Sequence, residues 1–232
     1  MGTVSATSFQ ELIEKEREQR RIFILDAAEE LFLAKGFSRV SMDEIAKKVG
    51  MNKATIYIYF EDKDSLFFGI ALRRMREHLK KIGDCAHRKA SGRERVLDMM
   101  AAGFAYSEAN QGFFHLFSAT GPERFRDTDN PLAKVIVEIL LKEEHLIRDA
   151  LNEGIADGSV RDDLDPREMA GYIRGTCGCI GSMDAGWREL LAPGGIGYRQ
   201  YTGDFLRFLD SAIAQPAGEG KIPVKRRTKG SP

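Results

Sequence analysis

Two short helices are confined to the residues between Ser41 and Phe60, and this segment restricts the possible folds more than any other part of the chain. Ser41 and Glu44 have the spacing of a capping box, so we expect a helix to begin after Ser41. Gly50 stops that helix, because glycine is the residue that most often ends one. After a short turn, Asn52 is suited to cap a second helix. Two short helices joined by a glycine-containing turn describe a helix-turn-helix.

The rest of the chain also has helical periodicity. A capping box at Ser8 and Glu11 precedes an amphipathic stretch from Ile22, which Gly36 ends. A long helix begins near Asp62. Further helices are expected at residues 92–110, 112–118, 130–154, 166–187 and 197–214. No segment alternates with the two-residue period of a strand, so the sequence predicts an all-α protein.

The composition is that of an ordinary globular protein. The 232 residues are 43% hydrophobic and 30% charged with a formal net charge of zero, so a surface that faces nucleic acid must be local. We expect neither a secretory signal nor a membrane span, since no segment is long and apolar enough. Three cysteines in such a chain suggest the reducing cytoplasm. We expect Cys177 and Cys179 to be buried structural thiols.

The second helix of the pair has one apolar side and one side suited to DNA. Ile56 and Phe60, four residues apart, supply the apolar side. Ala54 is small enough for close approach to base edges, and Lys53 can donate to guanine or to phosphate. The hydroxyl of Tyr57 can reach a phosphate. The alternative is a pair of small packed helices with tyrosines on the surface.

The stretch RRIFILDAAEELFLAKGFSRVSMDEIAKKVGMNKATIYIYFEDKDSLF resembles the DNA-binding segment of the TetR family. The matching features are AAEELF followed by KGF, then EIAKKVGMNKATIY, and then Tyr59-Phe60 and Lys63. The resemblance covers residues 20–66. It implies a homodimer whose two recognition helices enter successive major grooves of a pseudo-palindromic operator. It also implies repression that a small molecule relieves.

The resemblance assigns DNA contacts to particular positions. Those that match the family's contact positions are Ser41, Met42, Lys53, Ala54, Thr55, Tyr57, Ile58, Tyr59 and Lys63. Ser41 and Met42 stand where backbone amides at a helix start meet phosphate, and Lys63 matches a phosphate-binding lysine. Asp43 is acidic where some relatives place a basic residue, which puts a base contact from this position in doubt.

We expect four parts along the chain. Residues 1–19 are an N-terminal extension, 20–66 the helix-turn-helix DNA-binding domain, 67–214 a helical ligand-binding and dimerisation domain, and 215–232 a disordered basic tail. Whether Arg20, Arg21 or the tail adds DNA contacts stays open.

The middle of the chain is dense in large, soft side chains that suit a cavity for a lipophilic effector. We expect the pocket to be lined by Met99, Met100, Phe104, Phe113, Phe114, Phe117 and Arg124. The alternative is an ordinary apolar core. A drug-like aromatic, an acyl chain and a bile-type amphiphile are all compatible with this lining.

Four small residues share one helical stripe: Gly171, Gly175, Gly178 and Ser182. Because glycine destabilises a helix, such a stripe suggests close approach by another helix. TetR-like proteins dimerise through their last two long helices, so we expect a dimer interface here. Packing within the subunit is the alternative.

No nucleophile elbow, metal-ligand spacing or nucleotide fingerprint is present, so we expect no catalytic residues, no metal and no cofactor. An architectural DNA-binding protein is a second rival, but it would not need the aromatic-rich half. An activator, or a regulator without a ligand, remains an alternative to a repressor.

Overall fold

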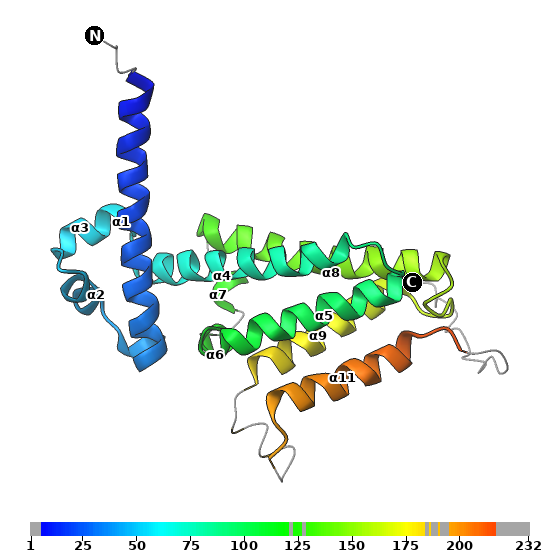
Figure 1. Cartoon of the computed structure of the whole chain (residues 1–232). Helices are drawn as coiled ribbons and strands as arrows, with labels where there is room; N and C mark the ends of the chain where they lie inside the picture. Colours follow the sequence, from blue (N-terminus) through cyan, green and yellow to red (C-terminus); the bar gives the residue numbers. More distant parts are fainter. Residues whose placement is uncertain are drawn as a thin grey trace, which may run out of the picture.

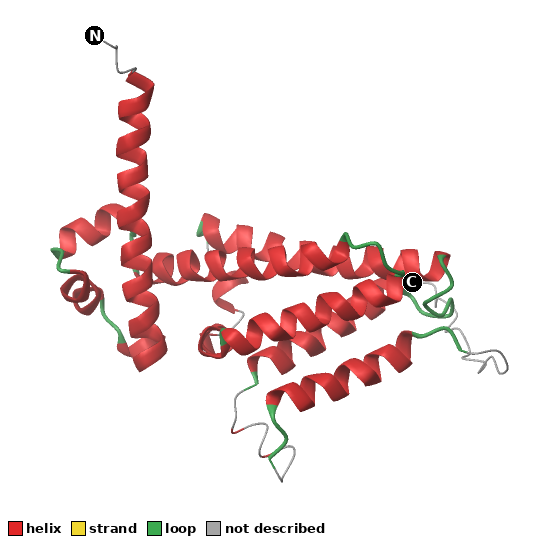
Figure 2. Ribbon diagram, in the orientation of Figure 1, coloured by secondary structure: helices red, strands yellow, loops and turns green. Residues whose placement is uncertain are grey.

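The computed structural model describes residues 6–120, 123–126, 129–183, 186, 190 and 195–216. The regular elements in these ranges are all helical (Figure 2), and the extended contact that the ranges contain is an isolated bridge between Val160 and Ala214. The predicted all-α fold is confirmed. The helices are α1 (Ala6–Lys35), the 3-10 helix η1 (Phe37–Arg39), α2 (Met42–Val49), α3 (Lys53–Tyr59), α4 (Lys63–Ala86), α5 (Gly92–Ala109), α6 (Gln111–Thr120), α7 (Glu123–Arg126), α8 (Pro131–Ala156), α9 (Pro166–Ser182) and α11 (Tyr198–Ile213).

The helices form a small N-terminal unit and a larger bundle (Figure 1). Helices α2 and α3 lie beside the lower half of α1, whose N-terminal half projects beyond the rest of the molecule. Helix α4 leads from this unit into the bundle, where α8, α5, α9 and α11 run alongside one another. Within the described ranges, no helix is long and apolar enough to cross a membrane.

The local signals around the helix-turn-helix act as predicted. Ser41 Oγ accepts from the Glu44 amide at 3.2 Å, and the Glu44 carboxylate accepts from the Ser41 amide at 3.0 Å, which completes the capping box. Gly50 has a φ of 69°, the left-handed conformation that ends α2. Asn52 Oδ1 accepts from the Thr55 amide at 2.8 Å and starts α3.

Several predicted boundaries differ from the structure. Ser8 lies inside α1, because the helix is already formed at Ala6, so Ser8 does not cap it. Helix α9 ends at Ser182 and not at residue 187, since Met183 is extended with a ψ of 120°. The short helix α7 was not predicted. The basic tail from residue 217 lies outside the described residues.

One apolar core joins the N-terminal unit to the bundle. It contains the buried side chains of α1, α2 and α3 and continues through Leu66 and Phe67 of α4 to Phe113 of α6 and Ile136 of α8. A second core, around Met99, fills the far end of the bundle. Because the first core crosses residue 66, the two expected domains share packed side chains there. A shift of α4 can therefore change the packing of both domains.

Candidate DNA-binding surface and effector cavity

Helix α3 turns one side to the core and the other to solvent. Ile56 is fully buried and Phe60, which follows the helix, is also buried, so these two side chains anchor α3 as predicted. Lys53 and Ala54 are exposed on the other side. Tyr57 is 45% exposed there. The exposed residues also include Ile58, whose 68% exposure is unusual for an isoleucine. This side of α3 is a short helical surface suited to base edges.

Lys53 is held by an acidic neighbour at the edge of this surface. Its Nζ donates to Asp43 Oδ2 at 2.9 Å, and both side chains are about half exposed or more. The carboxylate raises the pKa of Lys53 above its ordinary value, mainly through this hydrogen bond. To contact a base or a phosphate, the ammonium group of Lys53 must turn from Asp43 toward the DNA.

Other expected contact residues are also engaged by the protein itself. Met42 is buried in the core and Tyr59 is half-buried against it. The Thr55 hydroxyl donates to the cap Asn52 at 2.8 Å. Lys63 donates to the carbonyls of Phe37 and Val40, both at 3.0 Å, and its Nζ lies 4.4 Å from the centre of the Phe37 ring. Lys63 therefore fastens η1 to α4, with its donors directed to backbone carbonyls.

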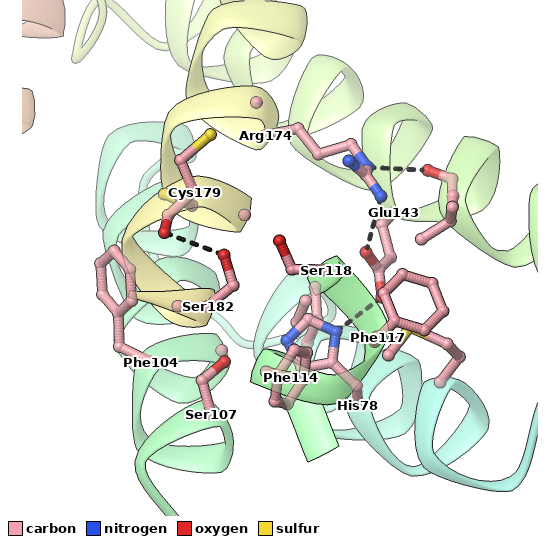
Figure 3. A pocket seen from close by; sticks show the side chains of 18 of the residues that line it. His78, Phe104, Ser107, Phe114, Phe117, Ser118, Glu143, Arg174, Cys179 and Ser182 are labelled. Carbon is pink, nitrogen blue, oxygen red and sulfur yellow. Dashed lines mark hydrogen bonds and ion pairs between the residues drawn. The ribbon is translucent and has the colours of Figure 1, made fainter. Parts of the chain in front are cut away.

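A mostly apolar cavity of about 540 Å³ lies inside the bundle (Figure 3). Such a volume is within the range of small-molecule sites. Helices α4, α5, α6, α7, α8 and α9 all contribute to its wall. The apolar part of the wall includes Met75, Ile82, Met100, Phe104, Phe114, Phe117, Phe125, Val137, Leu140 and Ile147.

The expected pocket residues divide into two groups. Met100, Phe104, Phe114 and Phe117 line the cavity. The other three are not in its wall: Met99, Phe113 and Arg124. Met99 and Phe113 are buried in the two cores. The guanidinium of Arg124 is paired with Asp64 and lies 4.6 Å from the Phe37 ring, so it braces α7 against α4 and η1.

Sequence reasoning missed the polar part of the cavity wall. His78 Nδ1 lies 2.7 Å from Glu143 Oε1, and the Glu143 side chain is only 5% exposed. Arg174 Nη2 lies 3.9 Å from Glu143 Oε2, and Arg174 Nε donates to the Leu140 carbonyl at 3.2 Å. The three side chains come from α4, α8 and α9. The available signal was the position of His78 between Met75 and Ile82 on the apolar stripe of α4.

The two neighbouring cysteines have different environments. Cys177 is partly buried, its Sγ lies 3.3 Å from Met100 Sδ, and burial raises the pKa of its thiol to about 12. It is an unreactive packing residue, as predicted. Cys179 is exposed, so its prediction as a buried thiol is wrong, because residues two apart on a helix lie on different faces. Among the described residues, no three His, Cys, Asp or Glu side chains could together hold a metal ion.

The three glycines of the small-residue stripe on α9 have open space beside them in the described part of the subunit. A Cβ built on Gly171, Gly175 or Gly178 would meet no atom within 4 Å. Packing against another helix in the described part of the subunit, the alternative explanation of the stripe, therefore does not account for these three glycines. Gly175, Gly178 and Ser182 also line the cavity, so the open face of α9 borders its wall.

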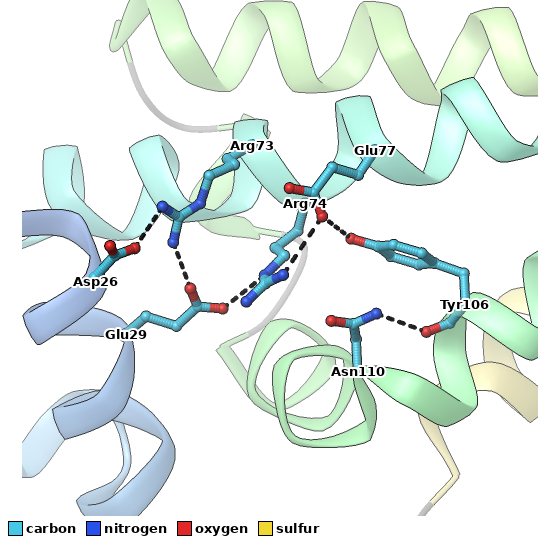
Figure 4. A network of polar contacts seen from close by, with 7 residues as sticks. All are labelled: Asp26, Glu29, Arg73, Arg74, Glu77, Tyr106 and Asn110. Atoms are coloured by element: carbon cyan, nitrogen blue, oxygen red, sulfur yellow. Dashed lines mark hydrogen bonds and ion pairs between the residues drawn. The ribbon is translucent and has the colours of Figure 1, made fainter. Parts of the chain in front are cut away.

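A chain of polar contacts connects the bundle to α1 (Figure 4). Arg73 of α4 donates to Asp26 and to Glu29 of α1, in both cases at 2.6 Å. Arg74 Nε donates to Glu29 at 2.8 Å. Burial opposes the charge on Arg74, but its bond to Glu29 and the charge of Glu29 raise the pKa above the ordinary value.

The same chain reaches the cavity through Tyr106 of α5. The Tyr106 hydroxyl donates to Glu77 at 2.7 Å, and Arg74 Nη1 lies 3.4 Å from the same carboxylate oxygen. Burial, together with the carboxylate acceptor, raises the pKa of this phenol, so it stays a donor. The Tyr106 ring centre is 5.5 Å from that of His78. The His78 side chain of the cavity wall is thus connected to Arg74, which holds α1, through Tyr106 and Glu77.

The N-terminal segment matches a known family model. The model described as "Bacterial regulatory proteins, tetR family" matches residues 24–70, which span α1 to the start of α4. The "Fatty acid metabolism regulator protein" of Bacillus subtilis is 25% identical over 162 residues, which are 70% of this chain and 81% of that protein.

Solved structures share the whole fold. The ketosteroid transcriptional regulator KstR2 of Mycobacterium tuberculosis superposes with a TM-score of 0.66 at 21% identity, over 85% of this chain and 96% of that one. The transcriptional regulator FadR of Bacillus subtilis, solved in complex with stearoyl-CoA, superposes with a TM-score of 0.65 at 22% identity, over 83% of this chain and 98% of that one. The likeness therefore extends beyond the helix-turn-helix to the bundle.

Proposed function

Because the chain belongs to the TetR family and is a DNA-binding transcription regulator, not an enzyme, we propose that it is a repressor that a small lipophilic molecule releases from its operator. The main support for the proposal is that α4 both lines the cavity and contacts α1. Its residues Met75, His78 and Ile82 line the cavity, while Arg73 and Arg74 hold α1.

A ligand in the cavity would change the preferred position of helix α4. A ligand shifts an equilibrium only by its differential affinity for the two conformations. A molecule that fills the cavity presses on His78 and Met75, which lie within one turn of the arginines that hold α1. A tilt of α4 would move α1 and, with it, the recognition helix.

We place the DNA contacts on the exposed side of α3 and at the start of α2. Lys53, Ala54, Tyr57 and Ile58 are the residues whose side chains are turned outward. In this proposal the amides of the first turn of α2, just after the cap Ser41, meet a phosphate. Lys63 has an indirect role in this proposal, since it orders η1 just before α2.

We propose that this repressor acts as a homodimer in the cytoplasm. The open stripe of Gly171, Gly175 and Gly178 permits close approach of a second copy through α9. Exposed aromatic rings on the last two long helices, Tyr172 of α9 and Phe208 of α11, add apolar surface that a partner could cover. Two linked recognition helices bind a two-fold operator far more tightly than one.

The names of similar regulators favour a long apolar effector. One structure with this fold is described with stearoyl-CoA and another as a ketosteroid regulator. The lining supports the same choice here, because large aromatic and aliphatic side chains dominate the wall. An acyl chain or a steroid-like amphiphile is therefore favoured over a drug-like aromatic.

Selection of genomic fragments by the purified protein tests the function. We expect enrichment of a few fragments that contain an inverted repeat, with affinity that falls steeply as salt rises. Apolar compounds that stabilise the protein should lower this affinity. Compounds that raise it would point to the activator alternative, and no preference over random DNA at moderate salt would reject the proposal.

A further inference from the structure

The apolar cavity contains a polar strip on its α5 side (Figure 3). Ser107 of α5 is 4% exposed, lines the cavity, and has no hydrogen-bond partner for its hydroxyl among the described residues. His78 Nε2 also has no such partner there and lies 3.2 Å from the position of a Cβ on Gly103. Because Gly103 and Ser107 are four residues apart and lie on one face of α5, the two polar atoms belong to the same wall of the cavity.

A polar atom that faces an apolar cavity without a protein partner favours a ligand group that can form a hydrogen bond with it. The backbone of α9 also approaches this strip closely. A Cβ on Gly181 would lie 2.9 Å from Ser107 Oγ, so glycine at this position keeps space for the hydroxyl. The strip is therefore enclosed by α4, α5 and α9.

Glu143 determines whether His78 donates a hydrogen bond to a ligand or accepts one. Its carboxylate only accepts hydrogen bonds, so His78 Nδ1, 2.7 Å away, must carry the hydrogen. In the neutral ring, Nε2 is then a bare acceptor that faces the cavity. The group that satisfies it must be a donor.

On the basis of the proposed function of this cavity, we infer that the effector is an uncharged, mostly apolar molecule with a hydroxyl group. The hydroxyl donates to His78 Nε2 and accepts from Ser107 Oγ. A hydroxyl donates and accepts at once, so a single such group can satisfy both an acceptor and a donor. Neither His78 nor Ser107 was predicted from the sequence to contact a ligand.

The electrostatics of the wall disfavour the competing chemistries. A carbonyl or a carboxylate has only lone pairs to present to the Nε2 lone pair. A carboxylate would also lie near Glu143, whose charge already has Arg174 as its counter-ion at 3.9 Å. Among the described residues of the wall, Arg174 is thus already paired with Glu143 and is not free to receive an anion.

Displacement of a neutral fluorescent dye, N-phenyl-1-naphthylamine, from the full-length protein tests the inference. The competitors are dodecan-2-ol, dodecan-2-one and dodecanoate, which have the same chain length. One neutral hydrogen bond corresponds to about a threefold to tenfold difference in affinity. We expect the alcohol to bind tighter than the ketone by that factor and tighter still than dodecanoate.

Three variants identify the source of the preference. His78→Phe should bring the alcohol-to-ketone ratio close to one. Ser107→Ala should weaken binding of the alcohol and of the ketone alike, because the serine hydroxyl can donate to either oxygen, and Ser211→Ala, at an exposed serine outside the cavity wall, should change neither affinity. If His78→Phe no longer binds the dye, Glu143→Gln serves instead, because it frees the ring to adopt either tautomer.

The outcomes separate two failures. Equal competition by the three compounds, tighter binding of the ketone or of dodecanoate, or an unchanged ratio in His78→Phe would overturn the inference and leave the cavity as an effector site. Absence of dye binding and of competition by every compound would instead reject the proposed function of the cavity.

Discussion

Arg74 Nε of α4 lies 2.8 Å from Glu29 Oε1 of α1, so one ion pair connects the helix that lines the cavity to the first helix of the DNA-binding unit. Glu29 is buried, and Arg73 binds its second carboxylate oxygen at 2.6 Å. A buried carboxylate with two arginines is costly to separate, because removal of one partner leaves a charge without compensation. The contact favours concerted movement of α1 and α4.

Tyr106→Phe tests the link between the cavity and this ion pair. The substitution removes the hydroxyl that donates to Glu77 at 2.7 Å but keeps the ring beside His78. We expect nearly unchanged operator affinity without effector and a ligand-induced loss of affinity that is several-fold smaller. Operator titration by fluorescence anisotropy with and without ligand measures both. Tyr201→Phe, at a tyrosine outside this chain of contacts, is the control, and an equal ligand response in Tyr106→Phe would refute the link.

Lys53→Ala and Asp43→Asn test the proposed DNA surface in opposite directions. Loss of Lys53 should weaken operator binding by about 1–3 kcal/mol if the lysine reads a base. Asp43→Asn should strengthen binding, because it removes an acidic group beside DNA and releases Lys53 from a 2.9 Å ion pair. Lys80→Ala, at an exposed lysine of the bundle, should change little. Affinity that is the same in all three variants would move the contact surface away from α3.

Gly175→Leu tests the proposed dimer interface. A Cβ at this position meets no described atom within 4 Å, so the subunit should still fold. A partner helix would be forced away, which leaves monomers with poor operator affinity. Size-exclusion chromatography with light scattering measures the assembly, and Gly83→Leu, at another open glycine of a helix, is the control. A Gly175→Leu protein that stays dimeric with full operator affinity would place the interface elsewhere.

The ion pair between Arg93 of α5 and Asp210 of α11 should give a pH-dependent contribution to stability. Arg93 binds both carboxylate oxygens, at 2.5 and 2.7 Å, and this hydrogen bond holds the pKa of Asp210 below its ordinary value. Because the folded pKa is lowered, the stabilisation is fully present above the unfolded value of about 3.9 and is lost as the pH falls through the folded value.

Asp210→Asn should therefore lower the free energy of unfolding at pH 7 by about 1 kcal/mol, since the pair is partly exposed. The difference from the parent should shrink below about pH 4. Urea unfolding across this range measures it. Asp204→Asn, which breaks an exposed pair within α11, should have a smaller effect. A difference that is constant with pH would show that the ion pair is not its cause.

The sequence was most informative where one local interaction determines the structure. Ser41, Gly50 and Asn52 each act on residues within one turn, so the boundaries of α2 and α3 could be predicted. The apolar stripe on α3 was predicted for the same reason, since Ile56 and Phe60 lie four residues apart.

The cavity depends on contacts that are remote in sequence. His78 and Glu143 are 65 residues apart, and only the packing of α4 on α8 brings them together. Large side chains alone could not distinguish a cavity wall from a core, so Phe114 was placed correctly while Phe113, its neighbour, is buried in the core. The engagement of Lys63 by backbone carbonyls likewise depends on the position of η1.

The central claim is that an apolar molecule in this cavity releases DNA, and Phe114→Trp tests it most directly. The larger ring fills part of the cavity but lies far in sequence from α3. Operator affinity is measured for parent and variant, with and without lipophilic compounds selected because they raise the melting temperature of the parent. The account predicts equal affinity without ligand, and a loss on ligand addition that is large in the parent and small in Phe114→Trp. Stabilising compounds that leave the affinity of the parent unchanged, or a variant that responds like the parent, would contradict it.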